Sequence, residues 1–415
     1  MYQKELYFED DTIFQLPIAL LDNRYKLSSS LVDDLELTQL KDQSNCSIYK
    51  NLFASSTIYG DKLINKWGKY YTDDIDYLKQ QQEIIKNLRY EKCQLTKMNE
   101  RWNEIQQNTS FLSDFQYFHH EKLAFVNDYP MFLTTYSFIN LLSPLTSLTV
   151  PFFLLLVPFF ILKFIRQIPL TLSSYFSVLK TTFQNHALGS IFSLSSRQGP
   201  SKAYAVISIV MYVYSTYNNI LSCIKYYKNF DYIHDTFDKL QNYLTISIRN
   251  INNFITTSKN IAKQYSSNKF NNFIENTENY SKNLIIYNDN IHTISPVFTF
   301  HKTMTNLGNL LHQFHQFRFN RDLKESFIYS FFFNSFLDNL NNIKLKLTYN
   351  VVNLTSYSDK DTCKITNVRY QNIPDSVSNS INLKDNYIIT GPNASGKTTI
   401  LKSTLLAVVY SQQIG

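Results

Sequence analysis

A long uncharged segment constrains the fold of this chain more than any other feature. From Tyr129 to Leu162 there are 34 consecutive residues without an acidic or basic side chain. A bilayer span needs about 20 apolar residues, so this run is long enough to cross a membrane. Pro144, Pro151 and Pro158 lie seven residues apart and would favour a re-entrant or interfacial hairpin. The alternative is a buried helical hairpin in a soluble α domain, but the length of the run favours membrane contact.

A second uncharged run, residues 203–224, is a weaker candidate for membrane contact because Ser, Asn and Tyr dilute it. The loop between the two runs contains no Asp or Glu but carries Lys163, Arg166, Lys180, Arg197 and Lys202. The positive-inside tendency would place this loop in the cytoplasm, and two simple spans would then put both termini on the opposite face. The topology therefore stays open. We expect the loop to meet anionic lipid in preference to DNA phosphates.

The composition excludes several protein classes. Four cysteines lie far apart without a C-x-x-C pair, which excludes a disulfide framework, a zinc finger and an iron–sulfur site. With 44% hydrophobic and 18% charged residues, the chain is too apolar for a disordered protein and too polar for a polytopic transporter. Eight glycines in 415 residues favour helix. No signal peptide follows Met1, so we expect an intracellular protein, and the net charge of +7 tolerates an anionic partner.

Helical periodicity dominates up to about residue 346. Apolar positions recur at helical spacing in 48–107, in a long helix or helix pair at 231–287, and in a Phe-rich stretch at 304–345. The residue pattern then changes. Leu347–Thr355 and Cys363–Arg369 are short segments rich in β-branched residues, in which apolar and polar residues alternate. These segments predict strands and the beginning of a mixed α/β domain.

A phosphate-binding motif follows these strands. The sequence GPNASGKT at Gly391–Thr398 matches G-x-x-x-x-G-K-[ST], with an apolar strand expected at Asn386–Thr390 and a helix expected at Thr399–Val409. In such a loop the backbone amides and the helix N-terminus face phosphate oxygens, the Lys reaches the β- and γ-phosphates, and the Thr hydroxyl ligates magnesium. The predicted site for ATP and Mg therefore comprises Gly391, Pro392, Asn393, Ala394, Ser395, Gly396, Lys397, Thr398 and Thr399, with Thr398 as the magnesium ligand.

The wider segment Ile389–Thr399, ITGPNASGKTT, resembles the Walker A segment of the MutS mismatch-repair family, T-G-P-N-x-x-G-K-[ST]. Upstream, Val377–Leu383 is similar to the family's stretch in which an Asn precedes the strand that enters the loop, and Asn379 matches that position. The Gly-Pro-Asn form of the loop is shared with a second ATPase group, so matches elsewhere in the chain are needed to separate the two.

Two such matches lie earlier in the chain. The MutS core domain opens with T-x-x-G followed by Trp. This chain has a similar set in Leu52–Phe53, Thr57, Gly60, Trp67 and Gln82. Gln81–Gln82 stands where Arg-Gln is usual in the family. The L-D-x-L that ends the family's returning lever helix resembles Phe336–Leu340. The order of these segments and the P-loop is the order found in the family.

The chain also departs from the family pattern. Arg369–Gln371 stands where R-H-P is usual, which leaves the purine contacts open. About fifty residues precede the core match, which leaves no room for a mismatch-reading domain, and we interpret Phe273–Glu275 as packing although it fits F-x-E. The apolar run replaces the DNA clamp. The chain ends 18 residues after Lys397, before the family's Walker B acid, so we expect no ATP hydrolysis by this chain alone.

The predicted fold is mainly α, followed by the start of a P-loop α/β ATPase domain. Its parts are a MutS core-like helical region at 1–128, apolar segments with a basic loop at 129–228, lever-like helices at 229–346, and the N-terminal part of the ATPase domain at 347–415. The resemblance implies an ATP-binding protein of mismatch repair or related DNA-structure recognition. It also implies mismatched or branched DNA as partner and a dimer formed through the ATPase domain.

Two other functions stay open. The first is an ABC-type transporter half, which also has apolar segments before a Gly-Pro-Asn P-loop. The second is a nonenzymatic membrane-attached scaffold, which would not need to hydrolyse ATP. As for metals, His312 and His315 form an i, i+3 pair, but no nearby Cys or carboxylate completes a ligand set. We therefore interpret the pair as a polar helix edge, and the adjacent His119 and His120 are weaker still as ligands.

Overall fold

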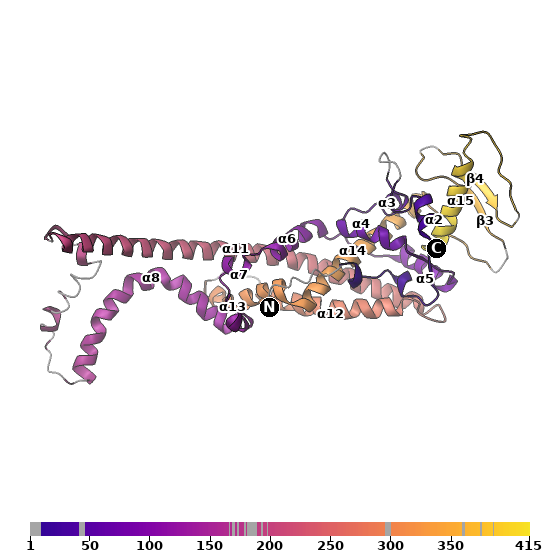
Figure 1. Ribbon diagram of the computed structural model, residues 1–415. Helices are drawn as coiled ribbons and strands as arrows, with labels where there is room; N and C mark the ends of the chain where they lie inside the picture. The colour runs from indigo at the N-terminus through magenta and orange to yellow at the C-terminus, as the bar shows by residue number, and fades with distance from the viewer. Residues whose placement is uncertain are drawn as a thin grey trace. The chain divides into compact units, whose positions relative to one another are not determined.

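The computed structural model describes residues 10–40, 46–165, 167, 171, 174–177, 180, 189–191, 194–196, 198–294, 300–358, 362–373, 376–384 and 386–415. These residues are mainly helical, as predicted, with a few short strands (Figure 1). The chain forms two compact units that are discontinuous in sequence. Unit 1 comprises Met1–Gln107, Asp238–Thr293 and Gln316–Gly415, and unit 2 comprises Asn108–Phe237 and Ile294–His315.

Unit 1 holds most of the predicted helices. Those expected within 48–107, 231–287 and 304–345 are confirmed. In chain order the unit contains α1 (Asp10–Ile13), η1 (Pro17–Leu20), β1 (Tyr25–Lys26), α2 (Ser29–Asp34), α3 (Ile48–Phe53), α4 (Ile58–Trp67), β2 (Tyr70–Tyr71), α5 (Ile75–Asn87), α6 (Leu95–Gln107), the end of α11 (Pro200–Ala262), α12 (Asn271–Ile294), the end of α13 (Phe300–Phe319), α14 (Arg321–Thr348), β3 (Lys364–Val368), β4 (Asn379–Asn382) and α15 (Lys397–Ser411).

Helix α14 forms the centre of unit 1. Every residue from Ser326 to Leu340 is buried, so this helix is enclosed on all sides rather than along one stripe. Its aromatic side chains pack on rings from other helices. Its buried polar side chains form hydrogen bonds with polar groups around them. The Asn334 amide donates to Ser247 Oγ at 2.7 Å, for example, which satisfies a buried polar group that would otherwise cost stability.

The strands are short and antiparallel. β3 pairs with β4, with Ile365 opposite Ile381, and the predicted strand at 363–369 is thereby confirmed. The strand predicted at Leu347–Thr355 is wrong, because α14 continues to Thr348 and Asn350 then adopts a left-handed conformation (φ 56°). The amide of Val351 bonds back to the Lys346 carbonyl at 2.8 Å. These residues terminate a helix instead of extending into a sheet.

Unit 2 contains the apolar run. In chain order it holds α7 (Phe111–Asp114), η2 (Glu121–Asp128), α8 (Pro130–Phe160), the π-helical turn η3 (Ile161–Ile165), η4 (Leu194–Ser196), the first part of α11 and most of α13. α8 is one helix through Pro144, so the hairpin expected within 129–162 is wrong. Prolines seven residues apart lie on the same side of a helix, and their local bends add, which explains the curvature of α8 in Figure 1.

Among the residues that the structure describes, none of the helices combines the length and the apolar character that crossing a bilayer demands.

Candidate nucleotide-binding site

The loop Gly391–Gly396 leads directly into helix α15. Ala394 (φ 63°) and Gly396 (φ 88°) adopt the left-handed conformation, and Gly396 is the residue that caps the helix. A side chain at Gly396 would meet no atom within 4 Å, so the backbone angle, not space, requires glycine there. The predicted helix after the motif is confirmed, and the nine predicted residues form one continuous loop and first helical turn.

The first turn of α15 offers unpaired hydrogen-bond donors. Within this described stretch the first intrahelical bond runs from the Ile400 amide to the Gly396 carbonyl at 3.0 Å. Among the described residues, the amides of Lys397, Thr398 and Thr399 donate to no backbone carbonyl, and Gly396 has no side chain to cap them. Such donors, together with the helix dipole, bind anions, and phosphate is the anion that most commonly uses them.

The Lys397 side chain curls back over the loop. Its Nζ donates to the carbonyl oxygen of Pro392 at 2.6 Å and to that of Gly391. The ammonium group is therefore held at the mouth of the loop, close to the amides that face outward. Both the loop and Thr398 are exposed, and no acidic residue occurs between Asn386 and Gly415. The local charge therefore favours an anionic ligand, and the Thr398 hydroxyl is free to ligate a cation that the ligand carries.

The segment that enters the loop differs from the prediction. Asn386–Thr390 forms no strand in the described structure, and Ile388 is 91% exposed. The strand that carries a P-loop is normally a parallel strand covered on both faces. β3 and β4 pair with each other, as Figure 1 shows beside α15, and no described strand lies against 386–390. Among the described residues, the loop Gly391–Gly396 is thus formed without the parallel sheet that usually supports a P-loop.

The opposite end of α15 is anchored in the helical core of unit 1. Gln413 is fully buried, and its side-chain nitrogen donates to the carbonyl oxygens of Trp67 and Tyr70, each at 2.7 Å. The hydroxyl of Tyr49 donates to its side-chain oxygen, and Gln81 donates to its backbone carbonyl at 3.1 Å. Sequence reasoning missed Gln413, although it had noted Gln81 and Trp67 as family-like positions.

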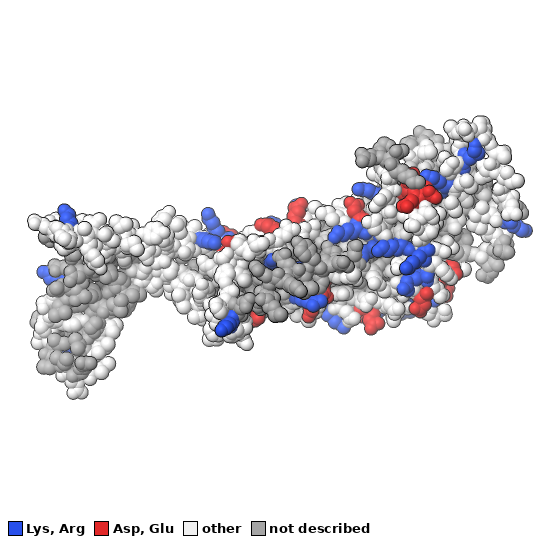
Figure 2. Space-filling view, in the orientation of Figure 1, with Lys and Arg blue, Asp and Glu red and all other residues white. Residues whose placement is uncertain are grey.

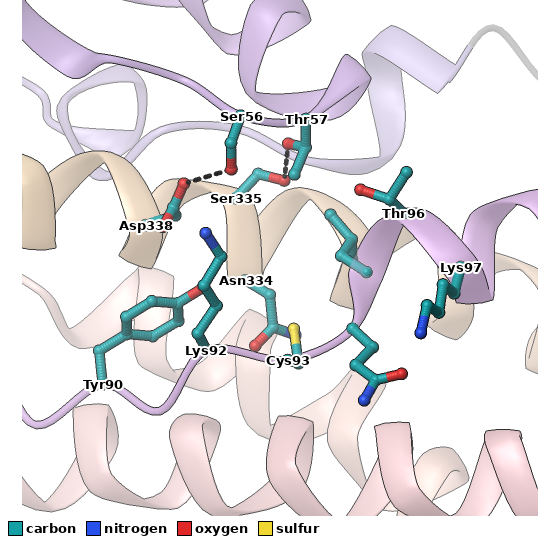
Figure 3. A pocket seen from close by; sticks show the side chains of 12 residues that line it. Ser56, Thr57, Tyr90, Lys92, Cys93, Thr96, Lys97, Asn334, Ser335 and Asp338 are labelled. Atoms are coloured by element: carbon teal, nitrogen blue, oxygen red, sulfur yellow. Dashed lines mark hydrogen bonds between the residues drawn. The ribbon is translucent and has the colours of Figure 1, made fainter.

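The surroundings of Thr57 and Asp338, which belong to two separate sequence motifs, meet in unit 1 (Figure 3). The Thr57 hydroxyl caps α4 by accepting from the Gly60 amide at 3.0 Å, and it also lies 2.8 Å from Ser335 Oγ on α14. Its neighbour Ser56 donates to the Asp338 carboxylate at 3.3 Å. Each bond joins one motif to the residue just before the other: Thr57 of T-x-x-G contacts Ser335, and Asp338 of L-D-x-L accepts from Ser56, nearly 280 residues away in sequence.

Trp67 completes this junction. Its ring stacks on Phe53 with 5.0 Å between centroids and lies 6.3 Å from Phe336, inside the L-D-x-L match. Trp67 thus lies between the helical core and the anchor of α15, because its ring packs on α14 and its carbonyl accepts from Gln413.

A cavity of about 480 Å³ opens beside the junction. Tyr90, Lys92, Cys93 and Asp338 line it, with Lys92 pointing toward the carboxylate in Figure 3. Burial raises the pKa of Asp338, while Lys92 and hydrogen bonds from Ser56 and Tyr90 act in the opposite direction. Burial likewise raises the pKa of Cys93 to about 12, so its thiol is a poor nucleophile at neutral pH. These residues form a polar junction without the groups that nucleophilic catalysis needs.

The remaining predicted residues lie away from the loop. Phe273 is buried and stacks on Phe333, which confirms packing as its role. The Asn379 side chain donates to the carbonyl of Val377, just before β4, at 3.1 Å. Gln371 accepts from the Tyr410 hydroxyl at 2.9 Å and so contacts the side of α15, not the phosphate-binding turn.

The two histidines of the pair, His312 and His315, have different surroundings. The interpretation of a polar helix edge is wrong for His315, which is buried, and burial lowers its pKa to about 4. Its nearest acid is Asp128, with 3.7 Å between Nδ1 and the carboxylate, while His312 lies 3.5 Å from the Asn127 carbonyl. Over the described part of the chain, no three His, Cys, Asp or Glu side chains come together as a metal site.

No protein-family model, curated protein or solved structure matches this chain.

Proposed function

We propose that this chain is a MutS-like ATP-binding protein that acts in mismatch repair or related DNA-structure recognition and clamps mismatched or branched DNA under control of the bound nucleotide. One observation carries the proposal. The loop Gly391–Gly396 delivers three unpaired amides and the Lys397 ammonium group to one exposed point at the start of α15. A triphosphate is the ligand whose charge and oxygen spacing suit that arrangement.

The residues of the loop fit ATP with magnesium. The β- and γ-phosphates would accept from the amides of the first helical turn, and Lys397 would exchange its carbonyl partners for phosphate oxygens. When bound, magnesium would neutralise phosphate charge, and Thr398 supplies a hydroxyl ligand for it. The activity proposed for these residues is the binding of ATP with magnesium.

Contact between the MutS-like segments supports the family assignment over a generic P-loop. Thr57 and Asp338 belong to separate sequence matches, and the structure brings both to one junction next to Trp67. Gln413 then ties the end of α15 to the Trp67 carbonyl. This continuous path gives the nucleotide a physical route to the long helices that would hold DNA. Dimerisation through the ATPase domain is proposed on the resemblance.

The experiment is a binding titration of the purified full chain with a fluorescent ATP analogue and magnesium. Lys397→Ala should weaken binding at least about tenfold, since it removes a charge-assisted hydrogen bond to phosphate. Lys402→Ala is the matched control, because Lys402 lies on the same helix but pairs with Glu36 at 3.4 Å. Thr398→Ala should reduce the difference in affinity between magnesium and EDTA. Equal affinity of the Lys397→Ala variant and the unaltered chain would refute the proposal.

A second titration addresses DNA. Branched or mismatched duplex should bind more tightly than perfect duplex of equal length, and ATP should change that affinity in the unaltered chain but not in the Lys397→Ala variant. Circular dichroism of each variant confirms that the helical fold is retained. If ATP binds but leaves the affinity for every DNA unchanged, the nucleotide site stands and the clamping function is refuted.

A further inference from the structure

The first half of α11, in unit 2, exposes large apolar side chains along most of its circumference. Between residues 204 and 217, seven of them are 57–75% exposed: Tyr204, Ile207, Val210, Met211, Val213, Tyr214 and Tyr217. α8 adds exposed Met131, Phe132 and Ile139. Soluble proteins rarely leave so much contiguous apolar surface without a binding partner. These exposed side chains count against the alternative of a buried hairpin, and membrane contact, which the length of the run favoured, stays a prediction.

In α8 and the first half of α11, the polarity is the inverse of that in a water-soluble helix pair: polar side chains face inward and apolar side chains face outward. The more buried positions of α11 between residues 198 and 224 recur every three or four residues and are mostly small or polar, such as Ala205, Ser208, Tyr212, Thr216, Asn219 and Cys223. Some of them contact α8, since Tyr212 donates to the Ser147 carbonyl at 3.0 Å and Cys223 lies 3.5 Å from the Leu141 carbonyl. Small and polar residues inside with apolar residues outside are typical of helices surrounded by lipid.

The second half of the same helix provides an internal comparison. From Ile233 onward most buried positions are apolar, with Ile233, Leu240 and Leu244 fully enclosed, although Thr236, Ser247, Asn250 and Ser258 are buried among them. A helix surrounded by water has this arrangement. The polarity changes near Lys225 and Lys228, where Tyr226 and Tyr227 also lie. Lysine and tyrosine are the residues that favour the boundary between acyl chains and water.

The charge of the segment is complementary to an anionic surface. Between Tyr129 and Phe230 there are seven Lys or Arg and no Asp or Glu, so the rest of the chain holds 33 residues of each sign. The entire net charge of +7 thus belongs to this segment. Figure 2 shows blue but no red over the end of unit 2 that carries it. Two of the seven, Arg166 and Arg197, lie outside the described residues.

We infer that α8 and residues 200–227 of α11 bind the surface of an anionic lipid bilayer. The outward apolar side chains enter the acyl-chain region, and Lys225 and Lys228 lie among the headgroups. Apolar burial supplies most of the attraction, and the lysines add electrostatic attraction to the anionic headgroups. This inference is independent of nucleotide binding.

The test is co-flotation of the purified full chain with vesicles of phosphatidylcholine containing about one quarter phosphatidylglycerol. The unaltered chain should float with these vesicles and less with pure phosphatidylcholine. Replacing Val210→Asp and Val213→Asp together should lower the bound fraction at least about tenfold, because each carboxylate must be dehydrated to enter lipid. Both valines are exposed, so the folded chain should tolerate the changes.

Two controls make the result decisive. Ile286→Asp changes an equally exposed aliphatic residue on α12, in unit 1, and should leave flotation unchanged. Lys397→Ala should also float like the unaltered chain, which separates lipid binding from the proposed nucleotide site. Equal flotation of the double Asp variant would overturn the inference. The inference would also be overturned if the chain did not bind vesicles but self-associated in proportion to its concentration, because a second copy would then cover this surface.

Discussion

The side-chain nitrogen of Gln413 lies 2.7 Å from the carbonyl oxygen of Trp67 and donates a hydrogen bond to it. This bond joins the segment after α15 to the end of α4, far away in the sequence. Since the phosphate-binding turn lies at the other end of α15, the position of that turn relative to the helical core depends on Gln413. The bond is therefore both a stability element and a part of the proposed path from the nucleotide to the long helices.

Replacing Gln413→Ala should lower the free energy of unfolding by about 2–4 kcal/mol, because the change opens a cavity and leaves buried polar partners unsatisfied. The partners that lose a bond are the Tyr49 hydroxyl and the carbonyls of Trp67 and Tyr70. Urea denaturation followed by circular dichroism measures the loss. The neighbouring Gln412→Ala is the control, since the bond from Thr72 to Gln412 uses its backbone carbonyl and survives the change. Equal stability of the two variants would contradict the anchoring role.

Gly60 gives a second prediction, because its α4 backbone lies close to the preceding turn. A Cβ added there would lie 2.0 Å from Ser55 Oγ and 3.1 Å from Thr57 Oγ1. A Gly→Ala change inside a helix normally stabilises by up to about 1 kcal/mol, whereas here overpacking should destabilise by about 1–3 kcal/mol. Ser55→Ala removes the closest atom, so the double variant should recover part of the loss. A double-mutant cycle of thermal unfolding measures this coupling, and strict additivity would show that the contact is absent.

Asp338 predicts a specific dependence of stability on pH. Burial raises its pKa above 3.8, so between that value and the raised one the folded chain binds more protons than the unfolded chain. Stability contributed by this group therefore falls as the pH rises through that window. The unaltered chain should gain stability relative to Asp338→Asn as the pH is lowered toward 4. Unfolding free energies at a series of pH values give the difference.

The Ser56 hydroxyl provides the check on that interpretation. Its hydrogen bond lowers the pKa of Asp338, so Ser56→Ala should move the window to higher pH. A stability difference between the unaltered chain and Asp338→Asn that rises with pH in the same range would show that the carboxylate is stabilised, not penalised, by its site.

The helices were predictable because they are encoded locally. The apolar periodicity of 48–107 and 304–345 needs no knowledge of a partner, and the helix expected after Gly391–Thr398 is present as α15, whereas phosphate binding by the loop stays a prediction. The junction between Thr57 and Ser335 was indicated only by family-like residues, and its geometry came from the structure. Gln413 carried no signal, because a single Gln becomes an anchor only through carbonyls distant in sequence.

The strands could not be predicted reliably, since a strand depends on a neighbour to pair with. Leu347–Thr355 has β-branched residues but serves to end α14, and Asn386–Thr390 reads as a buried strand but has no described partner. Inverted polarity in α11 was also hidden, because counting uncharged residues does not show which side of a helix faces outward.

The exposed segment before the phosphate loop yields the last prediction. Ile388 is 91% exposed, so Ile388→Ala should change the free energy of unfolding by no more than about 0.5 kcal/mol. Leu406→Ala on α15 removes an aliphatic side chain that is only 4% exposed, and it should cost about 2–5 kcal/mol. Both variants are compared by urea denaturation of the same full chain. If Ile388→Ala costs as much as Leu406→Ala, residues 386–390 are covered in solution, and the phosphate loop then rests on a buried strand after all.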